Sequence, residues 1–206
     1  MKLIDARKPG AYKILLRALA RGGVVATPTD TVYGLVGIVT PVVIRKIYRI
    51  KKRPAEKALP FFVKNIAAAK KLAAINKRQE RFLEHFWPGA LTAVLKKRNG
   101  FRAIKTSTVA LRMPADVFLI NLLVKVNRPL TGTSANISGK RALVSAREVL
   151  NEFKNQKYRP SLVVIETRKR KGARPSTIID ISSQDIKLIR RGVIPFKRIT
   201  ALWKNL

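Results

Sequence analysis

Apolar and polar positions alternate along the chain in blocks that predict helices and strands in turn. Residues 9–21 place apolar side chains at helical spacing, and Gly22-Gly23 follows them, which predicts a helix that ends at glycine. The short apolar run at residues 24–27 predicts a buried strand. Thr40-Pro41 and the capping-box sequence at 145–148 are typical of helix N-termini, because a hydroxyl there accepts an unpaired backbone N–H.

The same kind of pattern continues to residue 190. Further helices are expected at residues 41–50, 66–74, 77–86, 114–126 and 146–153. Further strands are expected at residues 60–63, 91–95, 109–113, 162–165, 177–181 and 186–190, with an extended segment at 129–133. Strands and helices mixed in this order predict an α/β fold, a sheet with helices packed on it. The 206 residues contain no internal repeat and no low-complexity linker, and this length fits one large domain or at most two small ones.

One polar break interrupts this pattern. At the end of the strand expected at residues 24–27 the apolar run breaks into Thr27, Pro28, Thr29, Asp30 and Thr31, and the sequence then turns apolar again. Buried polar groups cost free energy unless they are paired. The break is therefore either an ordinary turn or the wall of a pocket that needs small polar contacts.

Composition limits the compartment and the chemistry. The chain has no cysteine, which excludes a disulfide framework, a thiolate metal site and a cysteine nucleophile, and fits a reducing compartment. No apolar run approaches the length of a membrane span, and the segment before Gly22 carries Asp5 and is a poor signal peptide. We therefore expect a cytoplasmic protein with no membrane partner.

The charge is the most unusual property of the composition. The chain has 44 Lys and Arg residues against 11 Asp and Glu, a formal net charge of +33. Such a charge attracts nucleotides and nucleic acids by long-range steering, although most of these cations could equally form an ordinary solvated surface. The basic segment at 168–174 is either a lid or, as we favour, a solvated surface loop.

Several common catalytic devices are missing from the sequence. It has neither a phosphate-binding GxxxxGK[ST] loop nor a GxGxxG turn, and it has no GxSxG elbow. His85 is the sole histidine, which excludes a zinc cluster and a Cys/His pair. With so few carboxylates, a protein-only metal cage is not expected, so any divalent ion would arrive on substrate phosphates.

Four short clusters remain as candidates for a site. The cations of IKKRPAEK at 50–57 could hold phosphates, but at a helix end they are usually solvated. TGTSANISG at 131–139 suits an anion-binding turn or an ordinary Asx turn. Arg112 ends a predicted strand, where it can reach a carboxylate above the sheet. PSTIID and LIRRG, within residues 175–192, form the fourth cluster.

These clusters, taken with the polar break, resemble the YrdC-like family of threonylcarbamoyl-AMP synthases. The matching motifs are PTDTVYGL at 28–35, KKRPAEK at 51–57, FWPGALTAVL at 86–95, VALRMP at 109–114, TSANISG at 133–139, STIID at 176–180 and IRRG at 189–192. The resemblance runs from about residue 8 to 197. It implies a twisted, open, mixed sheet flanked by helices, with a large basic central cavity.

The resemblance also implies a reaction. Members of the family join L-threonine, bicarbonate or carbon dioxide, and ATP into threonylcarbamoyl-AMP, and release pyrophosphate. Mg²⁺ would be carried by the ATP phosphates. The product would pass to a downstream threonylcarbamoyl transferase complex that modifies tRNA, and tRNA itself is a further candidate partner.

Site residues follow from the resemblance position by position. Lys51 and Arg53, the K-x-R pair, correspond to the catalytic cations on the phosphates. The expected ATP-binding residues are Lys51, Arg53, Lys57, Thr108, Ser134, Asn136 and Arg190. The expected threonine-binding residues are Thr29, Thr31, Tyr33, Arg112 and Ser176. On this basis the polar break forms the mouth of the amino-acid pocket.

The chain departs from the family pattern in a few places, chiefly on the threonine side. These positions are Ala58, Phe62, Ala90, Asp116 and Ala142. The sequence resembles the short, single-domain form of the family, which implies that residues 1–206 form a single domain. The alternative function is a non-catalytic RNA-binding module, which would need the cations but not the uncharged pocket residues. A hydrogenase-maturation relative is disfavoured, since those proteins carry zinc-finger-like cysteines.

Overall fold

The computed structural model describes residues 1–54, 57–165 and 174–206. Its helices are α1 (Ala11–Ala20), α2 (Pro41–Lys51), α3 (Ile66–Lys70), α4 (Lys77–Glu84), α5 (Val117–Val126), α6 (Ala146–Phe153) and α7 (Phe196–Lys204). Its strands are β1 (Lys2–Asp5), β2 (Val25–Thr27), β3 (Gly34–Val36), β4 (Phe61–Phe62), β5 (Leu91–Lys96), β6 (Thr108–Arg112), β7 (Leu130–Thr131), β8 (Thr133–Ser134), β9 (Leu162–Ile165), β10 (Thr177–Asp180) and β11 (Lys187–Arg190).

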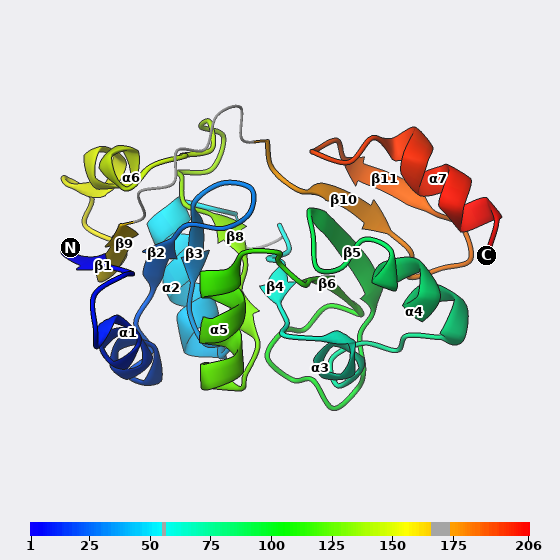
Figure 1. The fold of residues 1–206 in the computed structure, drawn as a ribbon, viewed down its shortest axis with the longest axis horizontal. Helices are drawn as coiled ribbons and strands as arrows, with labels where there is room; N and C mark the ends of the chain where they lie inside the picture. Colours follow the sequence, from blue (N-terminus) through cyan, green and yellow to red (C-terminus); the bar gives the residue numbers. More distant parts are fainter. Residues whose placement is uncertain (55–56, 166–173) are drawn as a thin grey trace.

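The strands form two mixed sheets that lie side by side (Figure 1). The first sheet has the order β1-β9-β2-β3-β8, and the second has the order β11-β10-β5-β6-β4-β7. Each sheet contains parallel and antiparallel pairs, for example β1 with β9 and β2 with β3 in the first. The predicted mixed α/β fold is confirmed, but the strands are divided between two sheets where we expected one.

A single glycine lets the chain cross from one sheet to the other. Thr131 ends β7, which pairs with β4 of the second sheet, and Thr133 begins β8, which pairs with β3 of the first. At Gly132, between them, a Cβ atom would lie 3.0 Å from three ring carbons of Phe62. The Thr131 hydroxyl also joins the sheets, because it donates to the Leu35 carbonyl and accepts from the Gly37 N–H.

Helices cover both faces of the first sheet. Alternate residues of a strand point to opposite faces. Val25 packs in one core cluster with Leu15 of α1 and Leu122 of α5. Its neighbour Ala26 packs in another cluster with Ile47 of α2 and with residues of α6. The first sheet therefore has apolar strands buried on both sides.

The second sheet buries one face and leaves the other for a pocket. Leu91, Ala93 and Leu95 of β5 belong to the same core cluster as Phe82 of α4 and Trp203 of α7. The residues between them on β5 point the other way, and one of them, Val94, lines a cavity.

Some predicted boundaries and elements differ from the structure. β1, β3 and α7 were not expected from the sequence. The helix expected from residue 114 begins at Val117, because the Asp116 side chain caps it by accepting the Leu119 N–H at 2.9 Å. Apart from Arg174, the basic segment at 168–174 lies outside the described residues. Among the described residues, no helix has the length and apolar character needed to cross a bilayer.

Candidate active site

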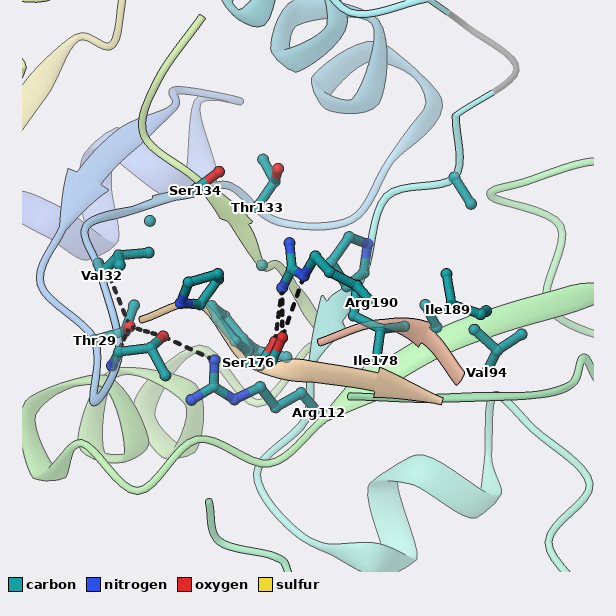
Figure 2. A pocket seen from close by; sticks show the side chains of 18 of the residues that line it. Thr29, Val32, Val94, Arg112, Thr133, Ser134, Ser176, Ile178, Ile189 and Arg190 are labelled. Carbon is teal, nitrogen blue, oxygen red and sulfur yellow. Dashed lines mark hydrogen bonds between the residues drawn. The ribbon is translucent and has the colours of Figure 1, made fainter. Parts of the chain in front are cut away.

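A cavity of about 260 Å³ opens where the free face of the second sheet meets the first sheet. Among the residues that line it are eight predicted site residues: Thr29, Thr31, Tyr33, Arg53, Arg112, Ser134, Ser176 and Arg190. They come from the segment after β2, from the segment after α2, from the ends of β6, β8 and β11, and from the residue before β10 (Figure 2). The sequence motifs thus converge on one pocket.

The polar break after β2 forms a hydrogen-bonded wall of this pocket. The Thr29 hydroxyl donates to the Val32 carbonyl at 2.7 Å, lies 3.0 Å from the Thr31 hydroxyl, and accepts the Thr31 N–H at 3.1 Å. Both threonines are buried, with exposed fractions of 2% and 4%. The alternative of a turn with solvent-facing hydroxyls is therefore wrong. The Tyr33 hydroxyl donates to the Val164 carbonyl of β9.

Arg112, at the end of β6, fixes this wall to the second sheet. Its Nη1 donates to the Thr31 hydroxyl at 3.0 Å, and its Nη2 lies 2.6 Å from Oδ1 of Asp30 in a buried ion pair. Its Nε donates to the Gly89 carbonyl at 2.8 Å. Burial lowers the pKa of Arg112, while the Asp30 carboxylate raises it. Asp30 was not among the predicted site residues, although its position between two of them, Thr29 and Thr31, could have indicated that it belongs to the site.

Ser176 and Arg190 form the middle of the pocket (Figure 2). The Arg190 guanidinium donates to the Ser176 carbonyl from Nη2 at 2.8 Å and from Nε at 3.2 Å, and to the Ser176 hydroxyl at 3.1 Å. That hydroxyl also lies 2.8 Å from the hydroxyl of Thr92 on β5. Burial lowers the pKa of Arg190, and so do the nearby charges of Arg112 and Arg53.

Arg53 supplies the third cation of the pocket. The chain leaves α2 through Lys52, whose backbone is left-handed with φ of 48°, and so turns Arg53 toward the cavity. Its guanidinium donates to the carbonyls of Lys57 and Ala58 at 3.1 and 2.9 Å. Three arginines thus line one cavity, and within the described residues their one ion pair is that of Arg112 with Asp30. Such a surplus of positive charge suits an anionic ligand.

Four predicted ATP-binding residues do not line the cavity as the described residues define it: Lys51, Lys57, Thr108 and Asn136. Lys51 is 1% exposed, and its ammonium faces the backbone of Ser134 and Asn136 behind the pocket. Burial, with the charges of Arg53 and Arg190, lowers the pKa of Lys51 to about 7. Thr108 lies on the pocket face of β6, beyond Ala110 and Arg112, and Lys57 is exposed.

An apolar wall completes the site and was missed from the sequence. Val94, Ile178 and Ile189 gather, in the view of Figure 2, on the side opposite Thr29 and Val32. The alternation along each strand could have identified these residues. Val94 and Ile178 lie between buried residues of their strands, and therefore point to the opposite face of the sheet. Phe62, one of the departures from the family pattern, is 2% exposed and also lines the pocket. The centroid of its ring lies 5.8 Å from the Arg112 guanidinium carbon.

The site offers little protein-based metal binding. Within residues 1–54, 57–165 and 174–206, no three or more His, Cys, Asp or Glu side chains come together as a metal cluster. The chemistry that the described pocket can support is therefore the binding and orientation of anions by arginines, with hydroxyls to fix small polar groups.

Comparison with known proteins places the chain beside enzymes of one kind. The family model of the Sua5/YciO/YrdC domain, described as "Telomere recombination", matches residues 17–192. A Methanocaldococcus jannaschii protein, provisionally named a threonylcarbamoyl-AMP synthase, is 33% identical over 96% of this chain and 93% of its own length. The Pyrococcus abyssi threonylcarbamoyl-AMP synthase is also 33% identical, over 91% of this chain.

A solved structure is similar in fold as well. Pyrococcus abyssi Sua5 in complex with L-threonine superposes with a TM-score of 0.88 at 31% identity, and the match covers 98% of this chain and 61% of that one. This chain also spans only 56% of the curated Pyrococcus abyssi synthase. The match therefore concerns only part of the Pyrococcus abyssi protein.

Proposed function

This chain belongs to the Sua5/YciO/YrdC family, and on that premise we propose that it is a threonylcarbamoyl-AMP synthase. Its substrates would be L-threonine, bicarbonate or carbon dioxide, and MgATP. The observation that carries the proposal is the convergence of Arg53, Arg112 and Arg190 with the hydroxyls of Thr31 and Ser176 on one cavity. An RNA surface has no need for the buried hydroxyls.

Threonine would bind at the Arg112 end of the cavity. Thr29, Thr31 and Arg112 form one hydrogen-bonded network there, and Ser176, which is bonded to Arg190 and Thr92, lines the same cavity. Among the described residues, Arg112 uses three of its five N–H groups on Asp30, Thr31 and Gly89, which leaves two for a substrate carboxylate. Pyrococcus abyssi Sua5, which has the same fold, has been solved in complex with L-threonine, and this supports threonine as a substrate.

ATP would bind along the rest of the cavity. Arg53 and Arg190 would face the phosphates, because they carry no carboxylate partner among the described residues, and Ser134 would add a small polar contact. Lys57 and Thr108 would extend the site at its rim, with Lys51 and Asn136 behind it. Mg²⁺ would come with the phosphates as part of the substrate, since the carboxylates in the described part of the chain do not form a cage.

The reaction needs orientation more than proton transfer by side chains. The threonine amine forms a C–N bond to carbon dioxide and loses a proton, or to bicarbonate with loss of water, and a carbamate results. A carbamate oxygen then attacks the α-phosphorus of ATP, the bond from that phosphorus to the bridging oxygen breaks, and pyrophosphate leaves with the electron pair. Fixed arginines neutralise the charge that develops on the phosphates, and binding both substrates in one cavity supplies proximity.

The product would pass to an enzyme that transfers the threonylcarbamoyl group to tRNA, because a mixed anhydride of this kind is reactive. Direct tRNA binding is a second candidate property, which the net charge of +33 favours. A salt titration tests it: phosphate-backbone binding would weaken steeply as salt rises, and a flat response would contradict it.

Pyrophosphate release from ATP tests the proposed activity. The purified protein is assayed in bicarbonate buffer with Mg²⁺, with and without L-threonine. Release that depends on threonine supports the synthase. An equal rate with and without threonine, or no release at all, contradicts it.

A further inference from the structure

Lys51 ends α2 with a fully satisfied side chain. Its ammonium lies 2.5 Å from the Ser134 carbonyl, 2.8 Å from the Asn136 carbonyl and 3.1 Å from the Asn136 side-chain Oδ1. In its protonated form the Lys51 side chain has three N–H donors, and here three oxygens accept them. No N–H of Lys51 is left over for a phosphate in the cavity.

The backbone of Lys51 holds the same loop. The Ser138 N–H donates to the Lys51 carbonyl at 2.8 Å, so both ends of this residue contact the segment of residues 134–140, which we call the serine–asparagine loop. Within the loop, the Ser134 hydroxyl donates to Asn136 Oδ1, and Asn136 Nδ2 donates to the carbonyls of Ile137 and Lys140. Lys51 is therefore the link between this loop and α2.

From this arrangement we infer that Lys51 is a positioning residue. It fixes the serine–asparagine loop so that Ser134 faces the cavity, and Arg53, two residues on, is the cation of the pair that meets the anion. To contact a phosphate, Lys51 would have to break bonds to carbonyls in a place where its side chain is 1% exposed. A buried charge that loses its hydrogen-bond partners costs free energy, so Lys51 and the serine–asparagine loop stabilise each other in position.

A positioning role for Lys51 predicts a different binding behaviour from a direct phosphate contact. If Lys51 acts through the loop, removing it and removing the Ser134 hydroxyl disturb the same interaction, and their effects on nucleotide binding are not additive. If Lys51 touches a phosphate, the two effects add, and the loss of one cation also lowers the salt dependence of binding. The identification of the ligand as a nucleotide rests on the proposed function.

Two measurements test the role of Lys51. The first is amide hydrogen exchange of the protein alone, without any ligand, in Lys51→Met and in the control Lys46→Met, which removes an exposed bond from the same helix to the Gly22 carbonyl. We expect Lys51→Met, and not Lys46→Met, to raise exchange in residues 134–140 by about tenfold. Unchanged exchange in that loop would overturn the inference, whatever the protein binds.

The second measurement is ATP affinity at several salt concentrations for Lys51→Met, Ser134→Ala and the double variant. We expect the double variant to bind no more weakly than the weaker single variant, with an unchanged salt dependence. Additive losses with a shallower salt dependence would assign Lys51 to the phosphates instead. If the parent protein binds no ATP, the proposed function fails while the exchange result still decides the role of Lys51. Lys51→Gln, which keeps two N–H donors and no charge, replaces Met if that variant does not fold, and should restore part of the loop protection.

Discussion

Arg112 and Asp30 form a buried ion pair that joins the second sheet to the polar wall after β2, with 2.6 Å between Nη2 and Oδ1. The side chain of Arg112 is 5% exposed and that of Asp30 is 15% exposed. The pair sets the direction of the guanidinium, whose other donors reach Thr31 and the Gly89 carbonyl. The proposed threonine site therefore depends on a carboxylate that need not touch threonine.

We expect Asp30→Asn to destabilise the protein strongly. The substitution leaves the Arg112 charge buried without its counter-ion, which typically costs about 3–5 kcal/mol. Urea denaturation measures the change. As a control, Asp5→Asn removes the exposed pair with Arg7, and we expect a far smaller effect there. Equal effects of the two substitutions would show that Arg112 does not depend on Asp30.

Gly132→Ala tests the crossing between the sheets. A Cβ atom at this position would lie 3.0 Å from three Phe62 ring carbons, and Phe62 is buried in the pocket wall. We expect a loss of about 1–3 kcal/mol in the free energy of unfolding, as overpacking usually causes. Gly100→Ala is the matched control, because a Cβ there meets nothing within 4 Å. Stability equal to that of the control would contradict the close approach of residue 132 to the Phe62 ring.

Lys51 gives the protein a specific pH dependence of stability. Burial, with the charges of Arg53 and Arg190, lowers the pKa of Lys51 from 10.5 to about 7 in the folded protein. Between these two values the unfolded chain binds the proton and the folded protein does not, so the free energy of unfolding rises with pH. The contribution is about 1 kcal/mol per pH unit over that window.

Denaturant titrations at pH 7 and pH 9 measure this dependence in the parent protein and in Lys51→Met. We expect the parent to gain more stability than the variant as the pH rises. Parallel curves would mean that Lys51 keeps its proton in the folded protein.

Arg190→Lys tests the need for a guanidinium at the middle of the pocket. The substitution keeps the charge but removes the two donors that together hold the Ser176 carbonyl. We expect the KM for ATP to rise by about tenfold, with a smaller change in the KM for threonine. Lys187→Met, on the same strand and exposed, is the control. An unchanged KM for ATP would show that Arg190 does not contact the phosphates.

Much of the pocket could be predicted from the sequence because its residues lie in short motifs at the ends of predicted strands. Arg112 was placed at the end of a predicted strand, and it lines the cavity together with Ser176 and Arg190 of the fourth cluster. The motifs could not show that Lys51 points away from the cavity while Arg53 points into it. That difference arises from the left-handed turn at Lys52, which the sequence signals only weakly.

The division into two sheets was harder to predict. β1 pairs with β9, more than 150 residues away in the chain, and its four residues carry no strong apolar alternation. β7 and β8 have two residues each, and their assignment to different sheets rests on close packing at Gly132. Such pairings depend on tertiary contacts, which the local pattern of apolar and polar residues does not predict.

The most direct test of the account is the identity of the product. The protein is incubated with MgATP, L-threonine and ¹³C-bicarbonate, and the nucleotide products are separated and weighed by mass spectrometry, with Arg53→Ala in parallel. The account predicts a threonylcarbamoyl-AMP species that carries the ¹³C label and is lost in Arg53→Ala. Hydrolysis of ATP without a labelled adenylate, or a labelled product that Arg53→Ala makes as fast as the parent, would contradict it.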